Sequence, residues 1–230
     1  MAPLSLAARL HGGVAVLLLA VGIFWGLKVV PPDAFQGDVQ RIMYLHVPSV
    51  STAYLAIIVT FCASILYLWK RDLRFDAVAL SSAEIGVVYL GITLATGSIW
   101  GKPTWGVWWT WDARLTVTAI VFTMYVGYLM LRAFAEEPQA GARYGAVLAI
   151  LGLPAMILNH FAVQWWRTLH QPSSLLRPGG PSVAPVMLWP LVFNIVAMLV
   201  AYSYFLLERV RLERIRHRTA EVRLKRGRRG

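Results

Sequence analysis

Six stretches of apolar residues, each long enough to cross a lipid bilayer, constrain this chain more than any other feature. They cover residues 12–30, 47–69, 77–100, 115–134, 144–165 and 183–207, and about 20 apolar residues are sufficient for one crossing. Only 14% of the residues are charged, whereas roughly 25% is usual in soluble domains. Because a backbone inside lipid must satisfy its own hydrogen bonds, the sequence predicts an all-α integral membrane protein with six transmembrane helices.

The chain is predicted to form a single polytopic membrane domain over residues 1–230, because no internal repeat or long polar insertion separates the spans. The first span follows Arg9 and resembles a secretory signal, but five further spans predict that it is retained as a signal-anchor. Cys62 is the only cysteine. Disulfides within the chain and thioether attachment of haem through a Cys-x-x-Cys-His motif are therefore excluded.

Basic residues predict the orientation in the membrane. Six spans place both termini on one side, which would carry sixteen lysines and arginines against six on the other side. The positive-inside bias then puts both termini in the cytoplasm. Ten of the sixteen lie in the tail at residues 208–230, so the tail decides the orientation. It is predicted to anchor the topology and to attract anionic lipid headgroups, and not to bind nucleic acid.

A tryptophan-rich segment lies between the third and fourth spans, with five of the ten tryptophans inside residues 100–111. An ordinary aromatic belt would place tryptophan at both interfaces, but only Trp69 falls on the predicted cytoplasmic side. If the segment is helical, four side chains share one face: Trp105, Trp108, Trp109 and Asp112. The segment is predicted to lie in the periplasmic interface as an aromatic platform for a flat ligand or for lipid.

Two of the five histidines fall at span ends on the same predicted side as the tryptophans. His46 stands in the sequence YLHVP, where Pro48 fits the first turn of a helix. His170 follows the fifth span in the sequence WWRTLHQP. Two imidazoles beside an aromatic platform favour a metal site, and the planar metal-containing ligand that needs aromatic walls is haem. His160, inside the fifth span, is predicted to be a hydrogen-bonded structural histidine.

Cations are frequent on the predicted outer side, where few are expected. They could pair with the two propionates of haem or with nearby carboxylates and lipid phosphates, and the sequence leaves both open. These residues are Arg41, Lys102, Arg114, Arg167 and Arg177. Arg114, which closely follows the tryptophans, is counted among the predicted haem-binding residues. Glu84 lies in the third span without an obvious partner in the sequence.

Residues 100–116 (WGKPTWGVWWTWDARLT) resemble the tryptophan-rich WWD motif of haem-handling proteins. Together with YLHVP, WWRTLHQ, six spans and this length, they resemble the cytochrome c maturation protein C family from about Arg41 onward. The resemblance implies that His46 and His170 are axial ligands of non-covalent haem b. It also implies a platform that contacts the haem edge, formed by Trp105, Trp108, Trp109, Trp111 and Asp112.

The resemblance further implies a role in c-type cytochrome biogenesis. In that role the protein delivers haem, at the periplasmic face of the bacterial inner membrane, to a periplasmic haem chaperone, and it is not itself an enzyme. The implied partners are the ATPase and permease subunits of an ABC transporter and a small single-span subunit. No Walker A motif is present, so ATP hydrolysis by this chain is not expected. Three alternatives remain: a haem lyase of the WWD family, a b-type electron-transfer cytochrome, and a permease subunit whose tryptophans contact only lipid.

Overall fold

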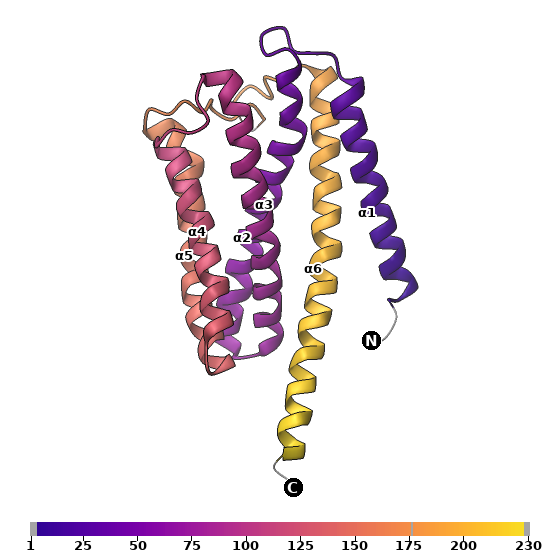
Figure 1. Ribbon diagram of the computed structural model, residues 1–230, viewed down its shortest axis with the longest axis vertical. Helices are drawn as coiled ribbons and strands as arrows, with labels where there is room; N and C mark the ends of the chain where they lie inside the picture. The colour runs from indigo at the N-terminus through magenta and orange to yellow at the C-terminus, as the bar shows by residue number, and fades with distance from the viewer. Residues whose placement is uncertain (1–3, 176, 228–230) are drawn as a thin grey trace.

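Six long helices run up and down along one axis of the molecule (Figure 1). The computed structural model describes residues 4–175 and 177–227. The helices are α1 (Leu6–Phe24), α2 (Met43–Lys70), α3 (Leu73–Trp105), α4 (Ala113–Phe134), α5 (Pro138–Trp165) and α6 (Pro185–Gly227). All six are long and apolar enough to cross a membrane. The predicted all-α fold with six membrane spans is confirmed.

Several helices extend beyond the apolar stretches because polar groups outside those stretches satisfy their ends. The Ser5 hydroxyl accepts the amide hydrogen of Ala8 at 3.2 Å and starts α1 well before residue 12. Asp72 caps α3 by accepting the amide hydrogen of Arg74 at 2.8 Å. Helix α6 continues through the basic tail. The side chain of His217 in that tail lies outside the described residues.

Helix α2 lies centrally and packs against α3, α5 and α6, whereas α1 packs mainly against α6 at the edge of the bundle (Figure 1). Small residues allow α2 and α3 to approach closely, as is usual between membrane helices. A methyl group added at Gly86 would lie 3.2 Å from the Ala56 side chain. The Ser82 hydroxyl donates to the Ala56 carbonyl at 2.9 Å and bonds the Tyr202 hydroxyl at 2.8 Å, which joins α2, α3 and α6.

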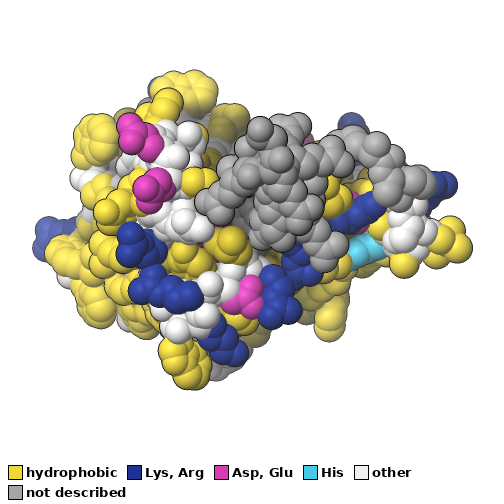
Figure 2. Space-filling model, turned by 90° about the horizontal axis from the view of Figure 1, so that it is seen from below, with side chains coloured by type: hydrophobic (Ala, Val, Ile, Leu, Met, Phe, Trp, Pro, Cys, Tyr) yellow, Lys and Arg dark blue, Asp and Glu magenta, His cyan; other side chains and the backbone are white. Residues whose placement is uncertain are grey.

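Both termini lie at the end of the bundle opposite the tryptophan-rich segment (Figure 1). Lysine and arginine side chains gather at this end (Figure 2), and two ion pairs brace it. Arg132 of α4 binds both carboxylate oxygens of the buried Asp76 of α3. Arg209 of α6 binds Glu84 of α3, with Nε 2.7 Å from the carboxylate. Glu84 therefore has a partner, contrary to its appearance in the sequence, because the basic tail continues α6 alongside α3.

Candidate ligand-binding site

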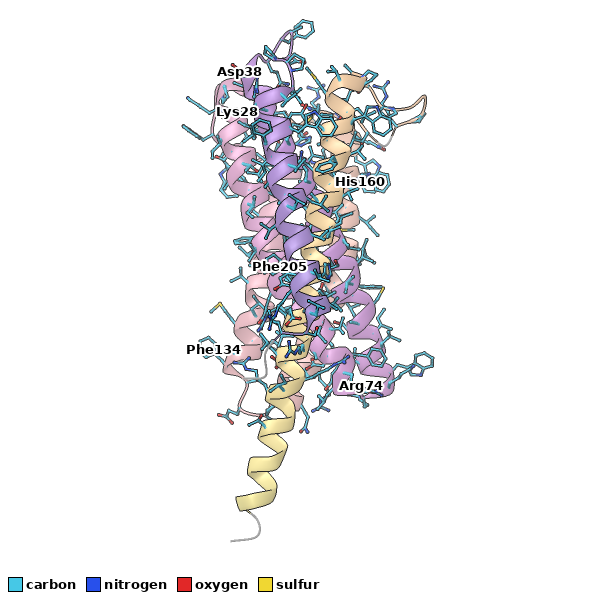
Figure 3. The ribbon with its side chains drawn as sticks, turned by 90° about the vertical axis from the view of Figure 1, so that its right-hand side faces the viewer. Lys28, Asp38, Arg74, Phe134, His160 and Phe205 are labelled. Carbon is cyan, nitrogen blue, oxygen red and sulfur yellow. The ribbon has the colours of Figure 1, made fainter. Side chains whose placement is uncertain are left out.

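A pocket lies between α2, α3, α4 and α5 near the end opposite the chain termini. Two connecting segments complete its wall, one at Trp109 and one over residues 170–175. His160 also lines it and lies below the level of Lys28 and Asp38 (Figure 3), so the pocket reaches down between the helices. Five of the eight predicted site residues line the pocket: His46, Trp105, Trp109, Arg114 and His170. Trp108, Trp111 and Asp112 lie outside the lining.

His46 is buried near the start of α2. A 3₁₀ turn over Asp38–Ile42 precedes this helix, so α2 begins at Met43 and Pro48 lies inside it. The prediction that Pro48 occupies the first turn is therefore wrong. The earlier helix start has a consequence for the site, because it places the His46 side chain in a regular helix facing α3.

Three neighbours on α3 fix the His46 ring. Its Nδ1 lies 2.9 Å from the Thr96 hydroxyl, and that hydroxyl donates its hydrogen to the Ile92 carbonyl at 2.6 Å. The Thr96 oxygen is thus an acceptor, so His46 Nδ1 carries the hydrogen and Nε2 keeps the lone pair. Trp100 packs edge-on against the ring, with centroids 5.7 Å apart. A methyl group added at Gly97 would lie 3.1 Å from His46 Cε1.

His170 lies on the connecting segment that follows α5. Its Nδ1 is 2.7 Å from the Gln171 carbonyl, an acceptor only, so Nδ1 again carries the hydrogen and Nε2 keeps the lone pair. The centroid of its ring lies 6.2 Å from that of the Trp105 ring. Burial in the pocket, assisted by the charge of Arg114, lowers the pKa of His170 to about 4. The imidazole is therefore neutral near pH 7, which is the form that binds metals.

Asp112 is a structural anchor for both sides of the pocket. Its Oδ1 accepts the amide hydrogen of Leu115 at 3.0 Å and caps the start of α4. Its Oδ2 accepts the amide hydrogen of Leu169 at 3.1 Å and the hydroxyl hydrogen of Thr110 at 3.3 Å. The sequence placed Asp112 in the aromatic platform. The structure shows that it orients two amides, one of them in the residue next to His170.

The tryptophans do not form one helical face. Helix α3 ends at Trp105, because Gly106 adopts a left-handed conformation with φ of 81° and its N–H bonds the Lys102 carbonyl at 3.0 Å. The following residues, up to the capping Asp112, are not helical. Trp105 and Trp109 face the pocket, whereas the side chains of Trp108 and Trp111 are 57% and 78% exposed. The helical arrangement considered from the spacing is therefore wrong.

Arg114 is the predicted cation that lines the pocket. Its guanidinium contacts the His160 carbonyl at 3.5 Å, and it forms no ion pair with any residue that the structure describes. Arg41 instead pairs with Asp38 at 2.7 Å, and Lys102 donates to the Gly106 carbonyl at 3.0 Å. An unpaired cation in an apolar pocket is suited to a carboxylate of a ligand.

Sequence reasoning did not single out Tyr54, which also lines the pocket. The Tyr54 hydroxyl is buried beside the Asn159 side chain. Its ring centroid lies 6.3 Å from that of His160, which the sequence predicted to be a hydrogen-bonded structural histidine and which also lines the pocket. Helical spacing could have predicted the position of Tyr54, because this residue follows His46 by about two turns on the same face of α2.

The groups that surround the pocket fit haem. Aromatic and aliphatic side chains make most of the lining, two imidazoles offer lone pairs on Nε2, and Arg114 supplies a positive charge. Trp109 Nε1 is also buried without an acceptor among the described residues. A flat, largely apolar, metal-containing ring with carboxylate substituents matches this set of groups.

Residues 4–225 match the family described as heme exporter protein C. The chain is 38% identical to heme exporter protein C of Haemophilus influenzae over 198 residues, which cover 86% of this chain and 80% of that protein. It is 37% identical to heme exporter protein C of Bradyrhizobium diazoefficiens over 228 residues, covering 96% and 85%. It is also 36% identical over 200 residues, covering 87% and 82%, to a putative cytochrome c biosynthesis ccmC-like mitochondrial protein of Marchantia polymorpha. The chain belongs to the heme exporter protein C family.

Proposed function

We propose that this membrane protein binds haem in the pocket, with His46 and His170 as the two axial ligands, and delivers it for c-type cytochrome biogenesis. The names of its relatives refer to haem export and to cytochrome c biosynthesis. The acceptor would be a periplasmic haem chaperone. The protein would act as a non-enzymatic subunit of an inner-membrane haem exporter complex, with the ATPase and permease of an ABC transporter and a small single-span subunit.

The hydrogen-bonding state of the two histidines carries this proposal. Both rings use Nδ1–H to bond a protein oxygen, Thr96 for His46 and the Gln171 carbonyl for His170. Both therefore keep the lone pair on Nε2, and an oriented, neutral imidazole of this kind is typical of metal ligands. Trp105 would pack beside the ring of the bound haem, and Arg114 would pair with a propionate.

Delivery is favoured over permanent retention because the two proposed ligands differ in how they are held. His46 lies in a helix and is fixed by α3, whereas His170 lies on a connecting segment outside any helix. A b-type electron-transfer cytochrome would be expected to hold both ligands on helices at mid-membrane. A haem lyase of the WWD family would be expected to carry additional spans. Trp108 and Trp111, exposed beside the pocket, would face the acceptor.

The visible spectrum of the purified protein tests the proposal. We expect the spectrum of low-spin haem with two histidine ligands, and transfer of that haem to the purified chaperone when the two proteins are mixed. A spectrum that persists unchanged with excess chaperone would indicate a cytochrome that retains its haem. Protein that binds no added haem would refute the proposal.

Replacing Thr96 by valine is expected to weaken haem binding about tenfold, because hydrogen-bond partners of metal ligands typically contribute at least this much. The change keeps the shape of the side chain but removes the oxygen that accepts from His46 Nδ1. Titration of the haem-free protein with haem measures the affinity. Thr123→Val is a matched control, because within the described part of the chain the Thr123 hydroxyl bonds only carbonyls of its own helix. Equal affinities for the two variants would contradict the assigned role of Thr96.

Reporter fusions test the orientation, which would place the haem site on the periplasmic side. Fusions after Arg74, Glu137 and Arg226 are expected to report a cytoplasmic location, and fusions near Asp38, Thr104 and Ser174 a periplasmic one. The structure places Asp38 and Arg74 at opposite ends of the bundle (Figure 3), so the two sets must give opposite signals. A periplasmic signal from the Arg226 fusion would invert the orientation.

A further inference from the structure

The turn at residues 33–37, between α1 and α2, is a closed and preorganised element. The Asp33 carboxylate accepts the amide hydrogens of Phe35 and Gln36, both at 2.9 Å. The backbones of Asp33 and Gly37 bond each other in both directions, at 3.1 and 2.9 Å. Gly37 has a φ of 57°, a positive value that glycine adopts readily. These hydrogen bonds close the turn locally.

The turn presents an aromatic ring to its surroundings. Phe35 is 99% exposed, although a phenyl ring is normally buried. The turn belongs to the segment that projects beyond α1 and α2 at the end opposite the termini (Figure 1). An aromatic side chain on a preorganised turn is a typical anchor in protein–protein recognition, because little conformational entropy is lost on binding.

Two contacts connect this turn to the proposed haem ligand. Gln36 Oε1 accepts the indole hydrogen of Trp100 at 2.9 Å. Trp100 then packs edge-on against the His46 ring, with centroids 5.7 Å apart and an interplanar angle of 77°. A displacement of Gln36 would therefore be transmitted to His46 through one intervening side chain, that of Trp100.

The surroundings of Phe35 favour a protein partner over a lipid surface. The turn begins at Asp33 and is followed by Asp38, whose side chain is 78% exposed. Hydrogen bonds from the two amides lower the pKa of Asp33, so its carboxylate stays charged. Inserting the ring into lipid would bring the Asp33 carboxylate and the Asp38–Arg41 ion pair towards the headgroups, at a cost in desolvation and in repulsion between Asp33 and anionic lipids.

We propose that the turn at residues 33–37 is a docking element for the protein that takes haem from this site. Phe35 enters an apolar recess of that protein, and Gln36 and Trp100 connect the contact to His46. This inference rests on the proposed function, since it requires a haem acceptor on the side of the pocket. It makes Gln36 a positioning residue for His46.

The docking contact is tested with Phe35→Ser and the matched control Phe134→Ser, since Phe134 is also exposed but lies at the opposite end (Figure 3). The affinity of the haem-free protein for the purified haem chaperone is measured first, so the result does not depend on haem binding. Phe35→Ser is expected to weaken this affinity roughly tenfold, as is typical for an anchor residue, and to leave the haem spectrum unchanged. Phe134→Ser is expected to change neither. Wild-type affinity in Phe35→Ser would overturn the proposal.

The connection to His46 is tested with Gln36→Leu and Gln36→Glu. The leucine variant loses the acceptor for Trp100 and is expected to shift the electron paramagnetic resonance signal of the bound ferric haem. The glutamate variant keeps an acceptor oxygen and is expected to restore the wild-type signal. An unchanged signal in Gln36→Leu would refute the positioning role.

A Phe35→Trp variant in vesicles of brominated phosphatidylcholine and phosphatidylglycerol distinguishes a membrane anchor from a docking contact. The lipids are expected to quench the fluorescence at position 35 no more than they quench the background of the parent protein. Strong additional quenching would identify a membrane anchor and overturn the docking proposal.

Discussion

Replacing both His46 and His170 by alanine is expected to remove haem from the purified protein altogether. Each imidazole would supply one axial bond through Nε2, and the hydrogen-bonded Nδ1 would orient that bond. Without both ligands, only apolar contacts and Arg114 would remain. Each single variant is expected to retain a small fraction of the haem with a spectrum of altered ligation. The haem-to-protein ratio and the visible spectrum measure the effect.

The controls for this experiment are histidines away from the pocket. His11 lies at the end with the termini, where its Nε2 bonds the Ser203 hydroxyl at 3.0 Å, and His11→Ala is expected to keep full haem content. His217→Ala, in the basic tail, is expected to behave in the same way. All variants must be present in the membrane at comparable amounts. A wild-type spectrum in the double variant would mean that other groups ligate the iron.

The membrane fold could be predicted from the sequence, because the length of an apolar stretch alone dictates a spanning helix. The ends of the helices were harder to predict, because they depend on individual capping residues. Gly106 ends α3 after Trp105, and Asp112 starts α4. Between them the chain is not helical, so the tryptophans that helical spacing would place together separate. Trp105 and Trp109 face the pocket, whereas Trp108 is exposed.

The candidate site could be predicted only in part, for a related reason. His46 and His170 could be placed on one side of the membrane, because each lies beside the end of a span. The contacts that orient them join segments far apart in the chain, such as Thr96 to His46 and Asp112 to Leu169. No spacing rule predicts such a pair. The same applies to the pairing of Glu84 with Arg209.

Replacing Asp112 by alanine is expected to impair haem transfer to the chaperone more strongly than haem binding. The carboxylate holds the amides of Leu115 and Leu169, so its loss would release the segment that carries His170. Each hydrogen bond contributes about 0.5–1.5 kcal/mol, and charged acceptors contribute more. Losing both is expected to reduce transfer roughly 10- to 100-fold. Haem would remain partly bound through His46, which this change does not touch.

This prediction is tested by measuring two quantities in the same cells: haem bound to this protein, and haem held covalently by the chaperone. Asp112→Asn keeps one acceptor oxygen and is expected to fall between wild type and Asp112→Ala. Trp108→Ala removes an exposed ring that lies outside the pocket lining, so it is expected to leave binding intact and lower transfer. Equal loss of both quantities in Asp112→Ala would mean that the segment serves affinity alone. Delivery requires the exposed edge of the segment to contact the acceptor. Normal transfer in Trp108→Ala would therefore mean that this side chain contacts lipid and not the acceptor.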